Sequence, residues 1–438
     1  MKRFIATLIL IVILLLLMTG CKVMLAIDHP DFSGQSNDAV RQQSGYTVAD
    51  SGHSADGLSF DGKIVIITNP IDINAVNIES IEDEYLLAEA LVARFGQERI
   101  VHKTWPFWNP AGEDIIDGIF QEISEDPEVR AMILLYSYTE DDYVIDSLKN
   151  IREDIFVVYI PSIHSEGVDN VASRVDLVIQ TNIQRLGENY VKQAISMGAD
   201  TIAHYSYPMH RAVPAYVMRR DAMKATAERE GIRFIDIEAP TSSADYIAGE
   251  MFITQDLPRQ VERLGANTAF FATGNAYQKP IISQIIATKA IFVLTNNPTP
   301  FSVYPEVFEI EAWIPTGEYE LVGRFERQIT RRLELSELLQ VLDEAVSAAG
   351  MSGRISCWAV PDNMMWIMIG FMYAVEWING NVPQENSVVD INVLNGFAND
   401  YMTRLGLNAE VTLENFTRDG DTVGNYILGV VDYYVFGN

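Results

Sequence analysis

The 438-residue sequence contains only two cysteines, Cys21 and Cys357. Two thiols cannot form a disulfide framework or a four-thiolate metal site. Basic residues are also few, because 31 Lys and Arg stand against 60 Asp and Glu and give a formal net charge of −29. A chain this acidic lacks the large basic face that neutralises phosphates. We therefore expect no nucleic-acid partner.

Signature motifs of catalysis are missing as well. The sequence has no H-E-x-x-H zinc motif, no G-x-S-x-G nucleophile elbow and no G-x-x-x-x-G-K-[ST] phosphate loop. The six histidines are scattered, and only His204 and His210 lie near each other, on either side of a proline-containing loop. Acidic clusters fall mostly at predicted helix starts, where the helix dipole favours negative charge without calcium. We expect no metal, no cofactor and no enzymatic activity.

The N-terminus has the order of an export signal. Lys2 and Arg3 precede an apolar run over residues 4–18. The alternative is a retained membrane anchor, but the run is shorter than the roughly 20 residues that span a bilayer. Residues 17–21 (Leu-Met-Thr-Gly-Cys) resemble the lipobox of bacterial lipoproteins. This resemblance implies that Cys21 is lipidated, that the body is extracytoplasmic and anchored to the cell membrane, and that Cys357 has no intramolecular partner.

From Lys63 onward, short β-branched runs alternate with helical stretches, the pattern of parallel sheets covered by helices. The continuous apolar run Ile64–Thr68 predicts a strand buried on both faces. A helix is predicted over residues 81–95, with Ser80 as its N-cap and Gly96 as its end. Further strands are predicted at 99–103, 131–136, 156–160, 176–180, 201–205, 234–237, 268–273, 291–295 and 354–358. Further helices are predicted near 112–124, 141–151, 187–197, 214–229, within 242–264, and at 277–287, 335–349 and 362–378.

The strand and helix pattern restarts after residue 182, which favours two lobes over one enlarged sheet. The predicted fold class is α/β, with two doubly wound parallel-sheet lobes. The expected segments are a signal peptide at 1–20, a lipidated Cys and flexible tether at 21–61, lobe 1 at 62–182 plus about 330–438, lobe 2 at 183–297, and a crossing or insertion at 298–329. The methionine-rich segment 362–378 is expected to be a buried hinge helix rather than a metal or partner surface.

Three segments resemble the type I periplasmic-binding proteins, the solute receptors of bacterial ABC importers. Residues 268–276 (TAFFATGNA) resemble a second-lobe strand and ligand-facing loop. Residues 356–382 resemble the family's late strand and helix, and residues 176–181 resemble its first crossing between lobes. The resemblance implies a multi-crossing hinge, an interlobe ligand cleft, an ABC permease as partner and a monomer. The segment 298–334 and the tail after 382 are longer than the family pattern.

In open parallel sheets, ligands bind outside the carboxyl ends of the strands, so residues that follow strands are the candidates. The ligand-binding candidates are Asn69, Ser137, Tyr138, Ser162, His164, Tyr205, Tyr207, Thr273, Asn275, Asn296 and Trp358. Most are neutral hydrogen-bonding or aromatic side chains, which suit a small polar solute such as a sugar or nucleoside. Each has an alternative role, because Asn is common in turns and aromatic rings often pack at lobe interfaces.

These features favour a membrane-tethered solute-binding protein that serves an ABC importer. One alternative is an extracytoplasmic enzyme on the same scaffold, which would need His164 or His204 within hydrogen-bond reach of a carboxylate in the cleft. Another is a ligand sensor that acts on a membrane signalling protein. The sequence alone does not separate transport from sensing.

Overall fold

The computed structural model describes residues 58–70, 78–106, 111–137, 141–163, 165, 171–240, 246–274, 277–294, 299–322, 325–385 and 388–437. The chain divides into two compact units, one made of Met1–Gly45 and Gly317–Ile329 and the other of Tyr46–Thr316 and Thr330–Asn438. Strands β9 (Trp313–Val322) and β10 (Phe325–Arg332) form a two-stranded sheet that contains the described part of the first unit. The rest of the description concerns the second unit.

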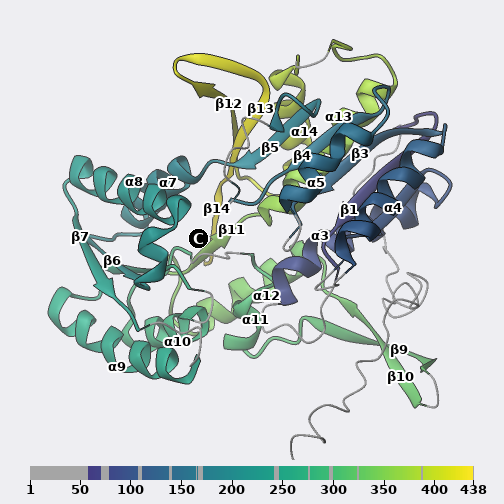
Figure 1. The fold of residues 1–438 in the computed structure, drawn as a ribbon. Coiled ribbons are helices and arrows are strands. Elements are labelled where there is room, and N and C mark those ends of the chain that lie inside the picture. Colours follow the sequence, from purple (N-terminus) through teal and green to yellow (C-terminus); the bar gives the residue numbers. More distant parts are fainter. Residues whose placement is uncertain are drawn as a thin grey trace, which may run out of the picture. The chain divides into compact units, whose positions relative to one another are not determined.

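A seven-stranded sheet forms the centre of what we call lobe 1 (Figure 1). Its order is β12-β13-β5-β4-β3-β1-β2, and only the β12–β13 pair is antiparallel. The strands are β1 (Lys63–Thr68), β2 (Ile100–Thr104), β3 (Val129–Leu135), β4 (Phe156–Ile160), β5 (Leu177–Thr181), β12 (Val411–Arg418) and β13 (Asp421–Val431). The hairpin β12–β13 thus comes from the far end of the chain and joins β5.

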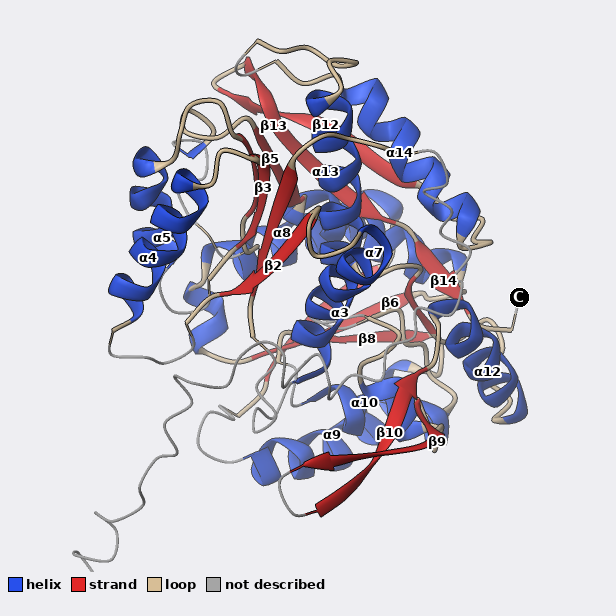
Figure 2. Ribbon diagram, turned by 90° about the vertical axis from the view of Figure 1, so that its right-hand side faces the viewer, coloured by secondary structure: helices blue, strands red, loops and turns tan. Residues whose placement is uncertain are grey.

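Helices cover both faces of this sheet (Figure 2). Alternate strand residues pack either with α3 (Ile78–Phe95) and α13 (Asp362–Ile378) or with α4 (Gly112–Glu125) and α5 (Asp141–Ser147). Helix α14 (Ile391–Arg404) packs on α13, and a short 3₁₀ turn, η2 (Leu148–Asn150), follows α5. The predicted burial of β1 on both faces is confirmed, because its residues from Ile64 to Thr68 are all buried.

The predicted start of the first helix is wrong. Helix α3 begins at Ile78, so Ser80 lies inside the helix and not at the N-cap position. The predicted end is confirmed: Gly96 follows α3 with a φ of 85°, a conformation that suits glycine because it has no Cβ.

A three-stranded parallel sheet forms the centre of lobe 2, in the order β7-β6-β8. The strands are β6 (Thr201–Ser206), β7 (Arg233–Glu238) and β8 (Thr268–Ala272). One face packs against α7 (Ile183–Ser196) and α8 (Pro214–Glu230), and the other against α9 (Tyr246–Leu264) and α10 (Gln278–Thr288). A 3₁₀ turn, η3 (Met209–Ala212), precedes α8, which starts with proline at its first position, as predicted.

The predicted strand at 291–295 is wrong. Only Ile291 and Phe292 pair, through isolated bridges to Ala269 and Ile355. The ladder stops because the next carbonyl, that of Val293, accepts a hydrogen bond from the Ser356 hydroxyl (2.8 Å) instead of a backbone N–H of a neighbouring strand.

The remaining elements adjoin lobe 2. Strand β11 (Ser356–Trp358) pairs antiparallel with β14 (Tyr433–Val435), and the bridge between Phe292 and Ile355 links this pair to the lobe 2 sheet. Helices α11 (Val303–Val307) and α12 (Leu335–Ala348) precede β11. Strand pairing therefore places β11 and β14 beside lobe 2. The sequence, in contrast, was expected to place residues from about 330 to 438 in lobe 1. The exact lobe boundaries stay a prediction.

The chain passes between the lobes three times, after β5, after β11 and after β13. Hydrogen bonds tie these crossings together. The Asn182 N–H donates to the Gly429 carbonyl (2.8 Å), and the Ala359 N–H donates to the Asp432 carbonyl (3.0 Å). Helix α13, which follows the second crossing, is buried from Met365 to Val375, as expected for a hinge helix.

Cys357 lies on β11 as a buried free thiol, and burial raises its pKa well above the usual range. In the part of the chain that the structure describes, no helix combines the length and the apolar character needed to cross a membrane.

Candidate functional site

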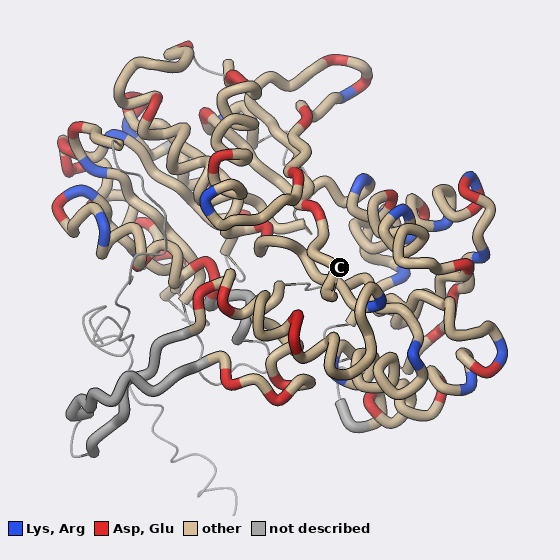
Figure 3. The backbone as a smooth tube through the Cα atoms, turned by 180° about the vertical axis from the view of Figure 1, so that it is seen from behind, with Lys and Arg blue, Asp and Glu red and all other residues tan. Residues whose placement is uncertain are grey.

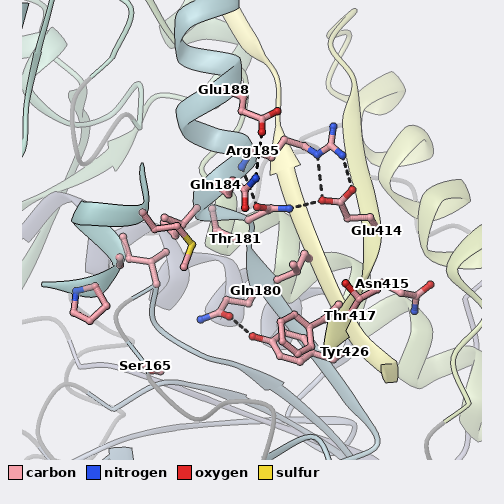
Figure 4. Close-up of a pocket in the computed structure, with 18 residues that line it drawn as sticks. Ser165, Gln180, Thr181, Gln184, Arg185, Glu188, Glu414, Asn415, Thr417 and Tyr426 are labelled. Carbon is pink, nitrogen blue, oxygen red and sulfur yellow. Dashed lines mark hydrogen bonds and ion pairs between the residues drawn. The ribbon is translucent and has the colours of Figure 1, made fainter. Parts of the chain in front are cut away.

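A pocket of about 770 Å³ lies where the two lobes meet (Figure 4). Lobe 1 contributes the end of β5, the residues after β4, and the facing strands β12 and β13. Lobe 2 contributes the first turns of α7 and α8. The pocket therefore opens at carboxyl ends of parallel strands, the position at which open α/β sheets bind ligands.

An ion pair joins the lobes at one wall of this pocket. Arg185 on α7 donates through Nη2 to Glu414 Oε2 (2.5 Å) and through Nε to Oε1 (3.2 Å), a bidentate arrangement. The side-chain amide of Asn182 also donates to Glu414, while its oxygen caps α7 by accepting from the Arg185 N–H (3.0 Å). The hydrogen bond to Glu414 raises the pKa of Arg185. The wall thus presents a fixed cation and carboxylate to the pocket.

Amides and rings form the opposite wall. Gln180 donates from Nε2 to the Ser162 carbonyl (2.7 Å) and accepts from the Tyr426 hydroxyl. The rings of Phe416 and Tyr426 lie 4.6 Å apart at 30°. Met218 on α8 also lines the pocket and is 52% exposed. The pocket therefore combines an aromatic surface with neutral hydrogen-bonding groups.

Thr181, which lines the pocket, also contacts a group of acidic residues at the hinge. The Thr181 hydroxyl donates to Asp362 (2.5 Å) and accepts from the Trp366 indole (3.0 Å). The neighbouring Asn363 amide donates to Glu84 Oε1, and Glu84 Oε2 is buried with no hydrogen-bond partner among the described residues. Burial raises the pKa of Asp362 and of Glu84, the latter well above its usual range.

The structure brings two of the predicted lobe 1 residues together. The Asn69 side chain donates to the carbonyl of Tyr136, which precedes the buried Ser137. Ser162 lies after β4 and meets Gln180 through its carbonyl. Asn69 and Ser137 therefore lie at adjacent strand ends, and Ser162 contacts Gln180, which lines the pocket.

The predicted lobe 2 residues also gather at strand ends. Thr273 donates its N–H to the Tyr205 carbonyl (3.0 Å), and its hydroxyl lies 2.9 Å from His210 Nδ1. The Tyr207 ring packs edge-on to His210 at 4.6 Å. The Tyr205 hydroxyl donates to Asp256 (3.0 Å), and burial raises its pKa. All three predicted residues are buried.

Trp358 lies apart from both groups, buried between β11 and the α7–α8 face of lobe 2. Tyr138, His164, Asn275, Asn296 and Cys21 lie outside the described residues. None of the described candidates is itself part of the pocket lining. The roles of all these candidates in ligand binding remain predictions.

Sequence reasoning missed the polar wall of the pocket. Arg185 and Glu414 are 229 positions apart, and no local pattern connects them. A signal was present for Asn182, because asparagine is a favoured N-cap residue and lies two positions after the strand predicted at 176–180. The hairpin strands carry no comparable signal, because their place beside β5 depends on long-range pairing.

Two buried histidines pair with carboxylates. His204 Nδ1 lies 3.1 Å from Asp236 Oδ1, and burial lowers the pKa of His204. His102 lies between Glu89 (2.5 Å) and the Thr68 hydroxyl (2.9 Å). Both rings are at most 3% exposed, and neither lines the pocket. Across the described ranges, no group of three or more His, Cys, Asp or Glu is placed to hold a metal ion.

Comparisons with known proteins agree with this architecture. A crystal structure named as a transcriptional regulator from Clostridium difficile 630 matches 86% of this chain and 100% of its own, with a TM-score of 0.71 and 18% identity. A sugar ABC transporter from Actinomyces odontolyticus ATCC 17982 matches 74% of this chain and 85% of its own, with a TM-score of 0.44 and 9% identity. The first match establishes the shared fold, and the second is too distant to carry an argument.

The expected α/β fold with two lobes built on mostly parallel sheets is confirmed, and the first of these structures shares it. By sequence, a protein of Treponema pallidum (strain Nichols), described as an uncharacterized protein, is 25% identical over 166 residues, which cover 37% of this chain and 76% of that protein. The family described as Protein of unknown function (DUF3798) matches residues 63–356. The chain belongs to this family.

Proposed function

We propose that this protein is an extracytoplasmic solute receptor that captures a small polar ligand between its lobes. The pocket where the lobes meet carries this proposal, because it is lined by both lobes and lies at carboxyl ends of parallel strands. Its volume of about 770 Å³ falls within the range of small-molecule sites.

The lining chemistry supports a ligand with a ring and several hydrogen-bonding groups, such as a sugar or nucleoside. Phe416 and Tyr426 offer a ring surface on which a planar or pyranose ring can pack. Gln180 and Asn415 offer neutral amides, and the paired Arg185 and Glu414 can bind hydroxyl groups. A ligand that contacts both lobes stabilises the closed arrangement, so binding shifts the population toward closure.

The proposal places the receptor outside the cytoplasm, lipid-anchored at Cys21, with an ABC permease as its partner. The leader and the lipobox-like residues 17–21 support the anchor. We further propose that the protein is not an enzyme, because the described His–carboxylate pairs lie in the interiors of the lobes instead of lining the pocket. A ligand sensor would share the same pocket and differ only in its membrane partner.

Native mass spectrometry of the purified protein tests ligand capture. We expect one small molecule per chain, either co-purified or bound from a panel of sugars and nucleosides. Replacing Met218 with Trp should abolish this binding, because Met218 lines the pocket and a larger ring would fill it.

A matched control is available on the same lobe. Met251 on α9 is similarly exposed, at 55%, but does not line the pocket, so Met251→Trp should retain the bound mass. Equal binding by both variants, or no binding by the wild type across the panel, would contradict the proposed function. Cross-linking of the ligand-bound receptor in membranes would then separate a permease from a signalling partner.

A further inference from the structure

The hairpin β12–β13 contributes the aromatic residues of the pocket, and its ladder is interrupted beside them. In the antiparallel pairing of the two strands, Asn415 of β12 lies opposite Ile427 of β13. The next residue of β12, Phe416, lies opposite Val423. Residues 424–426 of β13 are therefore skipped by β12 and form a bulge. Bulges of this kind bend a strand, re-aim its side chains and are frequent beside active sites.

The middle residue of this bulge, Asn425, is hydrogen-bonded to the body of lobe 1. Its side chain is 2% exposed, and Nδ2 donates to the carbonyls of Ala172 (2.7 Å) and Val175 (2.9 Å). These carbonyls belong to the segment that precedes β5. That segment is fixed to β4, because the Asp176 N–H donates to the Val157 carbonyl (3.0 Å) and the Asp176 carboxylate accepts from the Val157 N–H (2.8 Å).

The residues that adjoin the bulge form the aromatic surface of the pocket. Tyr426 follows Asn425 directly and is the first residue of β13 to pair with β5. Its hydroxyl donates to Gln180, a hydrogen bond that is drawn in Figure 4. The Phe416 ring, the first of β12 beyond the bulge, lies 4.6 Å from the Tyr426 ring. The hydrogen bonds of Asn425 therefore hold the point of the hairpin from which both rings reach the pocket.

Asn425 itself is not among the described residues that line the pocket. Both N–H groups of its side-chain amide donate to backbone carbonyls of lobe 1, so they do not serve a solute. Any effect of Asn425 on a bound solute has to pass through Phe416 and Tyr426.

We propose that Asn425 is a positioning residue of the pocket, which sets the place of Phe416 and Tyr426 by holding the β13 bulge on lobe 1. Its effect on binding rests on the proposed function. The ring positions that it sets are a property of the protein without solute, so they can be measured separately.

Crystal structures of the wild type and of Asn425→Ala, both without added solute, test the positioning directly. In the variant, we expect the Tyr426 hydroxyl to move out of hydrogen-bond distance of Gln180 and the Phe416 ring to shift away from the Tyr426 ring. Rings that stay in place in Asn425→Ala would overturn the proposal and leave the proposed function standing.

A matched control removes an amide hydrogen bond elsewhere in lobe 1. Asn379, which follows α13, donates to the Ser59 carbonyl (2.9 Å) and is not part of the described pocket lining. Both rings should keep their places in Asn379→Ala. If Asn425→Ala does not fold, Asn425→Ser, which keeps one hydrogen-bond donor, replaces it in every measurement.

Calorimetric titration with ribose, galactose, adenosine and uridine tests the consequence for binding. The solute that the wild type binds most tightly is then used for all variants. Phe416→Ala and Asn425→Ala should each weaken its affinity about fivefold, the value of an aromatic contact. The double variant should also lose about fivefold instead of the roughly 25-fold loss of independent residues, because Asn425 acts through the ring.

A merely structural role of Asn425 would give a different pattern. Arg185→Met changes the other wall of the pocket, so its fold-loss and that of Asn425→Ala should multiply. Asn379→Ala should bind the solute as the wild type does. Multiplying losses for Phe416 and Asn425 would overturn the proposal. A wild type that binds none of the four solutes would contradict the proposed function, whereas the ring positions would still decide the role of Asn425.

Discussion

The two lobes share a parallel-sheet architecture but differ in charge. Residues 58–182, which hold five of the seven strands of the lobe 1 sheet, contain 24 acidic and 8 basic residues. Residues 183–294, which hold the lobe 2 sheet, contain 11 acidic and 12 basic residues. Figure 3 shows this contrast along the backbone. Residues 58–182 therefore carry a net charge of 8 minus 24, or −16, whereas residues 183–294 carry 12 minus 11, or +1.

Both interiors enclose buried polar groups. Lobe 1 holds His102 with Glu89 and a carboxylate oxygen of Glu84 that has no hydrogen-bond partner among the described residues, and the α7–α8 side of lobe 2 holds His204 with Asp236. Buried polar groups cost free energy unless they are paired. The apolar clusters on the two faces of the lobe 1 sheet therefore form its scaffold, and the buried polar groups are exceptions in both lobes.

The largest effect is expected from a cavity in the apolar core of lobe 1. Ile133 at the centre of β3 is fully buried, so Ile133→Ala should lower the free energy of unfolding by about 2–5 kcal/mol. Ile115 on α4 is 37% exposed, and Ile115→Ala should cost less than about 1 kcal/mol. Denaturant titration measures both. Equal losses would contradict the view of lobe 1 as the apolar scaffold.

A smaller effect, dependent on pH, is expected from Glu84. Burial, followed by the nearby Asp362 and Asp83, raises its pKa well above 4.5, so the folded state holds a proton that the unfolded state releases. The stability that this group contributes is complete below pH 4.5 and is lost as pH rises through the folded-state pKa. Glu84→Gln should therefore raise stability at pH 8 by about 1 kcal/mol or more and flatten the loss of stability above pH 4.5.

Unfolding curves between pH 4 and 8 test this prediction. Glu228 on α8 is an exposed carboxylate of lobe 2, so Glu228→Gln should leave both stability and pH slope within about 0.5 kcal/mol of the wild type. A pH profile of Glu84→Gln that matches the wild type would show that Glu84 is not the titrating group.

The ion pair between the lobes, Arg185–Glu414, should contribute less to the free energy of unfolding than the change at Glu84. Arg185 and Glu414 are each 36% exposed, so solvent screens their interaction. A double-mutant cycle with Arg185→Met and Glu414→Gln should give a coupling of about 0.5–1 kcal/mol at low salt, falling as salt is added. The same cycle on Arg220 and Asp221, which are adjacent in the sequence of lobe 2, should give a smaller coupling energy. A coupling energy of zero at low salt would show that the pair does not stabilise the contact between the lobes.

The smallest effect concerns surface charge. Glu153 in lobe 1 and Glu262 in lobe 2 are both exposed. Glu153→Gln should raise the unfolding midpoint slightly at low salt, because it relieves repulsion in an acidic region, and high salt should erase the gain. Glu262→Gln should have no such effect, because its region is balanced in charge. Similar gains at both positions would contradict the contrast between the lobes.

Much of the fold followed from local pattern. The strand at Phe156–Ile160 and the helix at Asp362–Ile378 were predicted to the residue, because an apolar run and a long helical stretch between turn residues are local signals. The predicted strand at 291–295 failed because the Val293 carbonyl bonds a side chain far along the chain, Ser356. Such an interaction leaves no trace in the local sequence.

The sequence predicted where the site lies but not which residues line it. Carboxyl ends of parallel strands were expected to line a cleft, and the pocket lies at the ends of β4 and β5. Its polar wall depends on Glu414, which reaches Arg185 because the hairpin β12–β13 adds to β5. That pairing is set by the packing of distant segments, so sequence reasoning favoured residues nearer the strand ends.

The central claim is that the lobes close on a ligand held between them. Small-angle scattering of the purified protein, with and without the ligand identified by mass spectrometry, tests it most directly. The radius of gyration should fall on binding in the wild type and in Met251→Trp, and should not change in Met218→Trp. An unchanged radius at saturating ligand in the wild type would contradict closure.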